Sequence, residues 1–221
     1  MTYLQLINRV LRKLREGQIS SISGEKALFY GQLVNEAKTD LENAGPWHAL
    51  RTWLTGSLTP SSPDLDLTAS TDEYSYLMFE GVECPMAFIT TTDKERRLGV
   101  LSWSEMDSWH TLQPDADEGQ PTHVAFRNNG TGLVAKFFPT PDLAYTYRFE
   151  MVVNQAELEA EDDRISIPAT PVWREAVVRA MEERGEEFSG SLETERARAK
   201  EALMQAILAD WGGEQRTFRV V

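Results

Sequence analysis

Residues 2–17 read TYLQLINRVLRKLREG and predict the helix with which the fold begins. Thr2 and Gln5 have the spacing of a capping box, and Gly17 follows as a helix stop signal. Apolar side chains recur every three or four positions, as they do on one face of a helix: Leu4, Ile7, Val10, Leu11 and Leu14. An amphipathic helix over 2–16 cannot bury this face alone, so it needs partners elsewhere in the chain.

Three further helices are expected, one near the N-terminal end and two near the C-terminal end. Residues 24–44 carry a second apolar stripe, and Gly45-Pro46 closes it, because proline cannot continue a helix. Towards the other end of the chain, Thr170 is the expected cap of a helix whose first residue is Pro171. The last helix is predicted over 192–211.

The pattern between these ends changes to a period of two, which indicates strands. Residues 64–68 alternate cleanly, 86–91 is a short candidate, and 144–153 is the longest. Residues 122–127 and 133–138 flank Asn128-Asn129-Gly130, which suits a hairpin turn. One short helical turn is expected over 103–110, capped by Ser102 or Ser104. The middle is therefore predicted to be an antiparallel β-domain of about six to eight strands.

The predicted fold class is α+β, with N- and C-terminal helices packed as a helical bundle and an antiparallel β-domain inserted between them. The expected domains are a helical bundle of 1–54 and 169–212, a β-rich insertion of 55–168, and a C-terminal extension of 213–221.

Charge and composition restrict the function. The 221 residues carry a net charge of −13, and residues 55–168 hold 7 Lys/Arg against 20 Asp/Glu. This balance argues against a sequence-independent nucleic-acid clamp, which needs basic residues. The single cysteine, Cys84, excludes an internal disulfide. No apolar run reaches membrane-helix length and no secretory signal is read, so we expect no membrane partner and synthesis in the cytoplasm.

We expect no catalytic residues, no cofactor and no metal site. The histidines, His48, His110 and His123, are far apart and lack metal-ligand spacing. Two alternatives stay open. One is a small helix-turn-helix nucleic-acid-binding regulator that would use the basic residues of the first helix: Arg9, Arg12, Lys13 and Arg15. The other, less favoured, is a carboxylate-based hydrolase.

The six tryptophans divide into two groups. Trp47, Trp53 and Trp173 lie on or beside apolar helix faces and are expected in the core. Trp103, Trp109 and Trp211 are less tied to periodicity, and tryptophan is enriched at interface hot spots. One of these three is therefore a candidate assembly contact.

The sequence resembles bacteriophage head-to-tail adaptor (connector) proteins of the tail tubular protein A-like kind. The resemblance rests on the opening residues 3–15 and Trp47–Arg51, on Phe138–Asp142 followed by Tyr145–Glu150, and on the passage from Asp163 through Ile167-Pro168 into two amphipathic helices. It covers nearly the whole chain as a pattern of elements.

The resemblance implies a structural virion protein in a ring of about twelve copies that joins the portal protein to the tail tube or nozzle. Viral DNA would pass through its channel without specific binding. The helical part would dock on the portal, and the β-part would face the tail. Candidate contacts to the portal or a neighbouring copy are Trp211, Phe218, Val220 and Val221. Acidic residues expected to line the channel and repel DNA phosphates are Glu157, Glu159, Glu161, Asp162 and Asp163.

Overall fold

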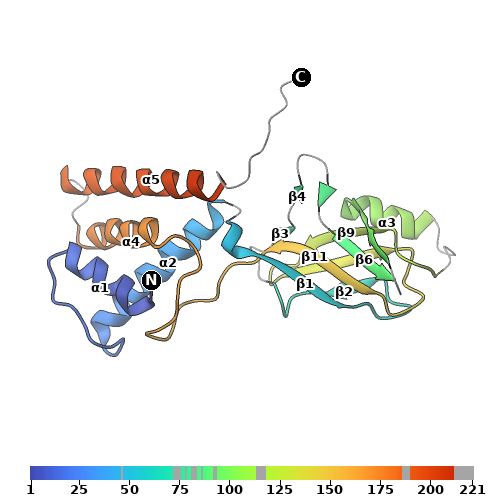
Figure 1. The fold of residues 1–221 in the computed structure, drawn as a ribbon, viewed down its shortest axis with the longest axis horizontal. Coiled ribbons are helices and arrows are strands. Elements are labelled where there is room, and N and C mark those ends of the chain that lie inside the picture. The colour runs from blue at the N-terminus through green and yellow to red at the C-terminus, as the bar shows by residue number, and fades with distance from the viewer. Residues whose placement is uncertain are drawn as a thin grey trace, which may run out of the picture. The chain divides into compact units, whose positions relative to one another are not determined.

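The computed structural model describes residues 1–45, 47–71, 76–77, 79–80, 84–85, 87–91, 94–112, 118–185 and 190–211. The chain forms two compact units (Figure 1). Residues 1–50 and 155–221 make a helical unit, and residues 51–154 make a β-rich unit. The predicted α+β class is confirmed, with helices from both ends of the chain in one bundle and the sheets between them in the sequence.

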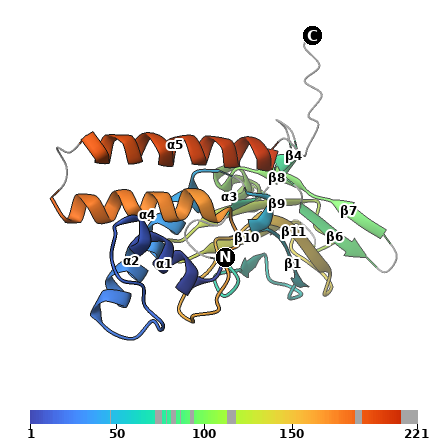
Figure 2. The ribbon, with the colours of Figure 1, turned by 60° about the vertical axis from the view of Figure 1, so that its left-hand side comes forward.

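The helical unit contains four α-helices and one short 3-10 turn among its described residues. They are α1 (Tyr3–Lys13), α2 (Glu25–Asn43), η1 (His48–Leu50), α4 (Ala169–Glu183) and α5 (Gly190–Trp211). Helix α4 contacts each of the other three helices, and α1 also contacts α2. Figure 2 shows α4 and α5 side by side along most of their lengths. The C-terminal helices therefore complete a core that the N-terminal helices begin.

The apolar stripe predicted for the first helix forms part of this core. On α1, Ile7, Val10 and Leu11 of that stripe are fully buried, whereas Leu4 and Leu14 are half-buried, and Leu6, which the stripe did not include, is also fully buried. On α4 the buried side chains include Val172, Ala176, Val177 and Ala180. The capping box at the start of α1 is present: the Thr2 hydroxyl accepts from the Gln5 backbone N–H at 3.4 Å, and the Gln5 side chain accepts from the Thr2 N–H at 3.1 Å.

Helix α4 begins earlier than predicted and without the predicted cap. Its first residue is Ala169, the cap position is Pro168, and no side chain caps the helix, so the assignment of Thr170 as the cap was wrong. Pro171 is therefore the third helical residue. The first turn of a helix has no intrahelical partner for its N–H groups, so a proline is tolerated there as well as at the first position.

The β-rich unit has two main sheets. The first orders its strands β1-β11-β6-β7, with β3 also paired to β11, and the second orders them β2-β10-β9-β8. The first-sheet strands are β1 (Arg51–Ser57), β3 (Tyr76–Leu77), β6 (Ala87–Thr91), β7 (Lys94–Arg97) and β11 (Thr146–Val152). The second-sheet strands are β2 (Asp64–Asp66), β8 (Gly99–Leu101), β9 (His123–Asn128) and β10 (Leu133–Phe138). A separate pair joins β4 (Phe79–Glu80) to β5 (Cys84–Pro85).

Both main sheets contribute to one apolar core. Phe137 of β10 stacks on Phe149 of β11 with ring centroids 6.2 Å apart, and Phe126 of β9 meets Phe149 edge-on at 5.1 Å. The predicted hairpin is present, since Leu133 pairs with Asn128 in an antiparallel register. The alternation predicted for the longest strand is also confirmed, because Tyr147, Phe149 and Met151 are buried.

One strand pair departs from the predicted antiparallel arrangement. Strands β8 and β9 are parallel, with Gly99 opposite His123. Parallel neighbours need a long crossover connection, and helix α3 (Trp103–Leu112) lies in that connection. This helix is longer than the single turn expected. Its start is capped by Ser102, whose hydroxyl accepts from the Glu105 N–H at 3.3 Å.

The prediction for the tryptophans is correct for Trp47 and wrong for Trp53 and Trp173. Trp47 is 1% exposed. Trp53 is half-buried with the Arg148 guanidinium 3.8 Å from its ring centroid, and Trp173 is half-buried with Arg174 at 4.8 Å. Aromatic faces attract cations that stay near water, so these two rings lie at the edge of the core.

Replacing Thr2 and Thr170 separately tests the assignment of the two helix starts. We expect Thr2→Ala to lower the free energy of unfolding by about 1 kcal/mol, since it removes a capping hydrogen bond. Thr170→Ala is the matched control and should change it by less than about 0.5 kcal/mol, because this hydroxyl caps nothing. Urea unfolding followed by circular dichroism measures both. A larger loss at Thr170 than at Thr2 would contradict the assignment.

Candidate functional site

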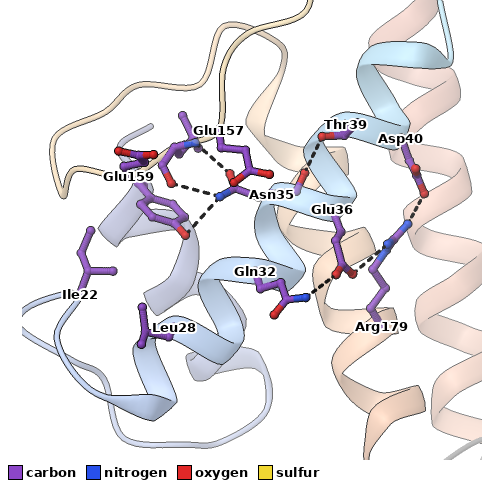
Figure 3. Close-up of a pocket in the computed structure, with 12 residues that line it drawn as sticks. Ile22, Leu28, Gln32, Asn35, Glu36, Thr39, Asp40, Glu157, Glu159 and Arg179 are labelled. Atoms are coloured by element: carbon purple, nitrogen blue, oxygen red, sulfur yellow. Dashed lines mark hydrogen bonds and ion pairs between the residues drawn. The ribbon is translucent and has the colours of Figure 1, made fainter. Parts of the chain in front are cut away.

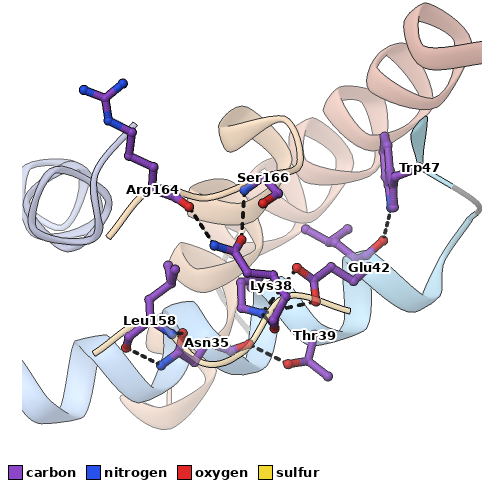
Figure 4. Close-up of polar contacts among 10 residues, drawn as sticks. Asn35, Lys38, Thr39, Glu42, Trp47, Leu158, Arg164 and Ser166 are labelled. Carbon is purple, nitrogen blue, oxygen red and sulfur yellow. Dashed lines mark hydrogen bonds and ion pairs between the residues drawn. The ribbon is translucent and has the colours of Figure 1, made fainter. Parts of the chain in front are cut away.

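The segment that returns from the β-rich unit, residues 155–167, is held on α2 by buried polar contacts. Lys38 and Glu42 of α2 are each 1% exposed, and the Lys38 Nζ lies 3.1 Å from a Glu42 carboxylate oxygen. The same ammonium donates to the Gln155 carbonyl oxygen at 2.6 Å (Figure 4). The pair thus positions the first residue of the returning segment.

Asn35, one turn before Lys38, holds the next part of the segment. Its amide donates to the Leu158 carbonyl at 3.1 Å and accepts from the Leu158 N–H at 3.1 Å, as a strand partner would. The Leu158 side chain is 2% exposed. Within the segment, the Gln155 amide donates to the Arg164 carbonyl at 2.7 Å and accepts from the Ser166 N–H at 2.9 Å. Residues 155–166 are therefore hydrogen-bonded to α2, and hydrogen bonds between the two ends of the segment close it into a loop.

Asp163 shapes the acidic turn of this segment. Its Oδ2 accepts from the backbone N–H groups of Ala160 and Glu159, both at 2.7 Å. These two donors lower the pKa of the Asp163 carboxyl, because they stabilise its charged form. Its backbone carbonyl also accepts from the Tyr3 N–H at 2.8 Å, so the turn is joined to the start of α1.

A cavity of about 670 Å³ lies between α2, the acidic segment and α4. Figure 3 shows Ile22 and Leu28 on one side of it and the Arg179 guanidinium beside Glu36 and Asp40 at the other end. Arg179 donates to Glu36 Oε2 at 3.4 Å and also to Asp40 Oδ2. The cavity thus has an apolar end and an end where charges are paired.

The other residues with ionisable side chains in the cavity lining are Tyr3, Glu157 and Glu159. The Tyr3 side chain is 6% exposed, and burial, with a smaller contribution from the Glu157 carboxylate, raises the pKa of its hydroxyl. Four of the lining residues are acidic and one is basic, while histidine and cysteine do not occur among them. Such a cavity favours a ligand with positive charge and an apolar group.

The structure separates the five acidic residues predicted to line a channel. Glu157 and Glu159 line the cavity, and Asp163 holds its own turn. Glu161 and Asp162 are both exposed, and the Glu161 carboxylate accepts from the Ile22 N–H at 3.1 Å. All five belong to the helical unit, which begins again at Gln155, whereas the β-rich insertion was expected to run to residue 168. The β-rich unit, 51–154, has 7 Lys/Arg against 15 Asp/Glu.

The predicted contact residues lie at or beyond the end of α5. Trp211 is its last residue, and Phe218, Val220 and Val221 fall outside the described residues. Within the described part of α5, Asp210 Oδ2 lies 3.0 Å from the His48 backbone nitrogen and 3.0 Å from its Nδ1. The helix therefore ends beside the turn that follows α2.

Sequence reasoning missed Asn35, Lys38 and Arg179. Lys38 and Glu42 have the i,i+4 spacing of a solvent-exposed helical pair. The one signal of burial was position, since Lys38 follows Val34 by one turn on the apolar stripe of α2. Asn35 binds Leu158, 123 residues away in the sequence, and Arg179 binds Glu36, 143 residues away. A local sequence pattern does not predict contacts over such separations.

Two of the four basic residues that a helix-turn-helix regulator would use, Arg9 and Lys13, contact other helices of the bundle. Lys13 Nζ lies 2.9 Å from a Glu195 oxygen on α5, and the Arg9 guanidinium lies 5.6 Å from the Trp173 ring centroid on α4. Both cations therefore face neighbouring helices of the bundle. This arrangement does not favour phosphate binding by α1.

In the parts of the chain that the structure describes, no three His, Cys, Asp or Glu side chains come together as metal ligands. None of the described helices combines the length and apolarity needed to cross a membrane.

Comparison with known proteins gave one family. The family model described as SU10 adaptor protein matches residues 1–220. A search of curated proteins found no match. The family match spans both the helical and the β-rich unit and agrees with the adaptor resemblance noted in the sequence.

The acidic turn makes a pH-dependent contribution that Asp163→Asn should remove. A lowered pKa in the folded state stabilises the protein above the unfolded value of about 4 and is lost as pH falls through the folded value. At pH 7 we therefore expect Asp163→Asn to have a lower urea midpoint than the unmodified chain, with the difference shrinking below about pH 4. Asp162→Asn, the adjacent exposed control, should match the unmodified chain. A difference for Asp163→Asn that persists unchanged at pH 3 would refute this role.

Proposed function

This chain belongs to the SU10 adaptor protein family and has a structural adaptor role in a bacteriophage; from this premise we propose that it forms the ring that joins the portal to the tail or nozzle. The observation that carries the proposal is the family match over residues 1–220. In this proposal the chain acts in the virion without catalysing a reaction, and viral DNA passes through the ring without specific binding.

The architecture supports a role in assembly. Helices from both ends of the chain share one core, and the returning segment is tied to α2 by buried Lys38 and by Asn35. Close packing gives a unit of this kind low compressibility, so it resists deformation when neighbouring proteins press on it. We propose that the helical unit docks on the portal while the β-rich unit faces the tail, in a ring of about twelve copies.

The acidic balance supports a channel that DNA does not adhere to. The chain has 35 Asp/Glu against 22 Lys/Arg, and carboxylates repel phosphates. Of the five residues predicted to line the channel, Glu161 and Asp162 are exposed and lie outside the cavity lining, and the Glu161 carboxylate is bound by the Ile22 N–H. We propose Asp162 as the member of the acidic segment that faces the passing DNA.

Mixing the full-length chain with portal rings of the same phage tests the docking proposal. We expect a stable complex in which about twelve copies sit on one portal, because ring interfaces repeat with the symmetry of the partner. Native mass spectrometry gives the stoichiometry, and electron microscopy shows which unit touches the portal. An unrelated acidic protein of similar mass is the control. A portal that stays bare at saturating adaptor concentration would contradict the proposal.

Reversing the charge at Asp162 tests the channel proposal on the assembled complex. Asp162→Lys should make the ring retain duplex DNA at about 50 mM salt and release it at a few hundred millimolar, since phosphate contacts weaken as salt rises. Asp162→Asn is the control that removes charge without reversing it. Filter retention of labelled DNA measures the effect. Equal retention by the unmodified chain and Asp162→Lys would place this residue away from the channel.

A further inference from the structure

We propose that the cavity between α2, the acidic segment and α4 binds the C-terminal segment, residues 212–221, of a second copy of this chain. The inference rests on the proposed ring, and it names the contact that would link one copy to the next. Three features carry it: the charge of the cavity, its uncovered apolar end, and the reach of the segment.

The charge in the cavity is only partly compensated. Four carboxylates line it against the single guanidinium of Arg179, which is bound by Glu36 and Asp40. In the described part of the chain, no cationic side chain pairs with the carboxylates of Glu157 or Glu159. These two lie on the acidic segment, away from Arg179 (Figure 3). A cationic group of another molecule would find its partner there.

The apolar end of the cavity is uncovered. Leu28, on the first turn of α2, is 65% exposed, and its neighbour Phe29 is 42% exposed. Inside the cavity, Ile22 lies beside Leu28, and the buried Leu158 and Tyr3 complete the lining. An aromatic side chain placed against Leu28 would be removed from water together with it, which is favourable by about 25 cal/mol for each Å² of apolar surface.

The C-terminal segment has the complementary chemistry. Residues 212–221 read GGEQRTFRVV, so Arg216 and Arg219 flank Phe218. The two arginines match Glu157 and Glu159, and the phenyl ring matches the apolar end at Leu28. The segment opens with two glycines, which have no Cβ and so permit backbone angles that other residues disfavour. In this proposal Phe218, predicted from the sequence as a contact residue, binds at the apolar end of the cavity of a neighbouring copy.

The position where the segment begins favours a second copy as its acceptor. Asp210 lies against His48, beyond the C-terminal end of α2, whereas Leu28 lies on its first turn. From Leu28 to Asn43 the helix rises about 22 Å at 1.5 Å per residue. Phe218 is seven residues beyond Trp211 and reaches at most about 25 Å when fully extended. Binding within one chain would leave no length for passing around α2.

The donor helix also presents apolar surface to a neighbour. Near the end of α5, Met204 is 53% exposed and Leu208 is 67% exposed, one turn apart on the same side. The C-terminal segment therefore follows a helix end that carries exposed apolar side chains, which a neighbouring copy would cover. A contact that repeats from the donor surface of one copy to the acceptor cavity of the next closes a ring.

A labelled peptide of residues 212–221 tests the cavity directly. The receptor is the full-length chain carrying Arg216→Ser, Phe218→Ser and Arg219→Ser, so that its own segment cannot compete with the peptide at the native or the charge-reversed cavity. We expect saturable binding by fluorescence anisotropy, weakened at least tenfold by Glu157→Lys with Glu159→Lys, and weakened by added salt. Asp162→Lys is the matched control, since it reverses an exposed carboxylate of the same segment outside the cavity. No saturable binding at millimolar peptide would overturn the proposal.

Exchanging the charges identifies the contact. A peptide with Arg216→Glu and Arg219→Glu should bind the Glu157→Lys, Glu159→Lys receptor and fail to bind the receptor with its native carboxylates. Leu28→Ser should weaken either peptide, whereas Leu143→Ser, at an exposed leucine of the β-rich unit, should not. Equal binding to the native and charge-reversed cavities would place the segment elsewhere.

Mixing two full-length variants distinguishes binding between copies from binding within one copy. The donor carries Glu157→Lys and Glu159→Lys, and the acceptor carries the three substitutions in the segment. Sedimentation velocity should show a 1:1 complex in the mixture and none in either variant alone. Peptide binding without a complex would show that the segment of one full-length chain does not reach the cavity of another, and would overturn the assignment. Failure to dock on portal rings, with the complex intact, would instead count against the proposed function alone.

Discussion

The buried ammonium of Lys38 is the constraint on which the helical unit depends. A charge removed from water costs several kcal/mol unless nearby groups replace its hydration. Here the Glu42 carboxylate and the Gln155 carbonyl oxygen do so at 3.1 and 2.6 Å. Gln155 lies at the point where the chain re-enters the helical unit after the sheets. Because the buried Lys38 ammonium needs the Gln155 oxygen as a partner, it fixes the position of the backbone at that point. Asn35 then holds Leu158 one step further along, and the acidic turn and cavity follow from that register.

Local patterns predicted the parts of the fold that local interactions determine. The capping box at Thr2, the stripe of α1, and the hairpin around Asn129 are each readable within about ten residues. The parallel pairing of β8 with β9 could not be read this way, because Gly99 and His123 meet only through α3. The cap assigned to Thr170 failed because Pro168 and Pro171 both suit a helix start, and the sequence alone does not order such competing signals.

The candidate site was less accessible to sequence reasoning than the fold. The acidic residues from Glu157 to Asp163 were recognised as a group, yet their separate environments depend on Asn35 and on the Tyr3 contact at the start of α1. A charge count treats these carboxylates as equivalent. In the structure Asp163 stabilises a turn, Glu157 and Glu159 line a cavity, Glu161 accepts from the Ile22 N–H, and Asp162 is exposed.

The insertion of the sheets has a consequence for how this architecture can vary. The β-rich unit begins and ends on neighbouring antiparallel strands, with Arg51 opposite Val152. Its two ends are therefore about one strand spacing, roughly 5 Å, apart. A module whose ends lie together can be lengthened, shortened or exchanged at little entropic cost to the host fold. The β-rich unit can thus be remodelled while the helical bundle stays unchanged.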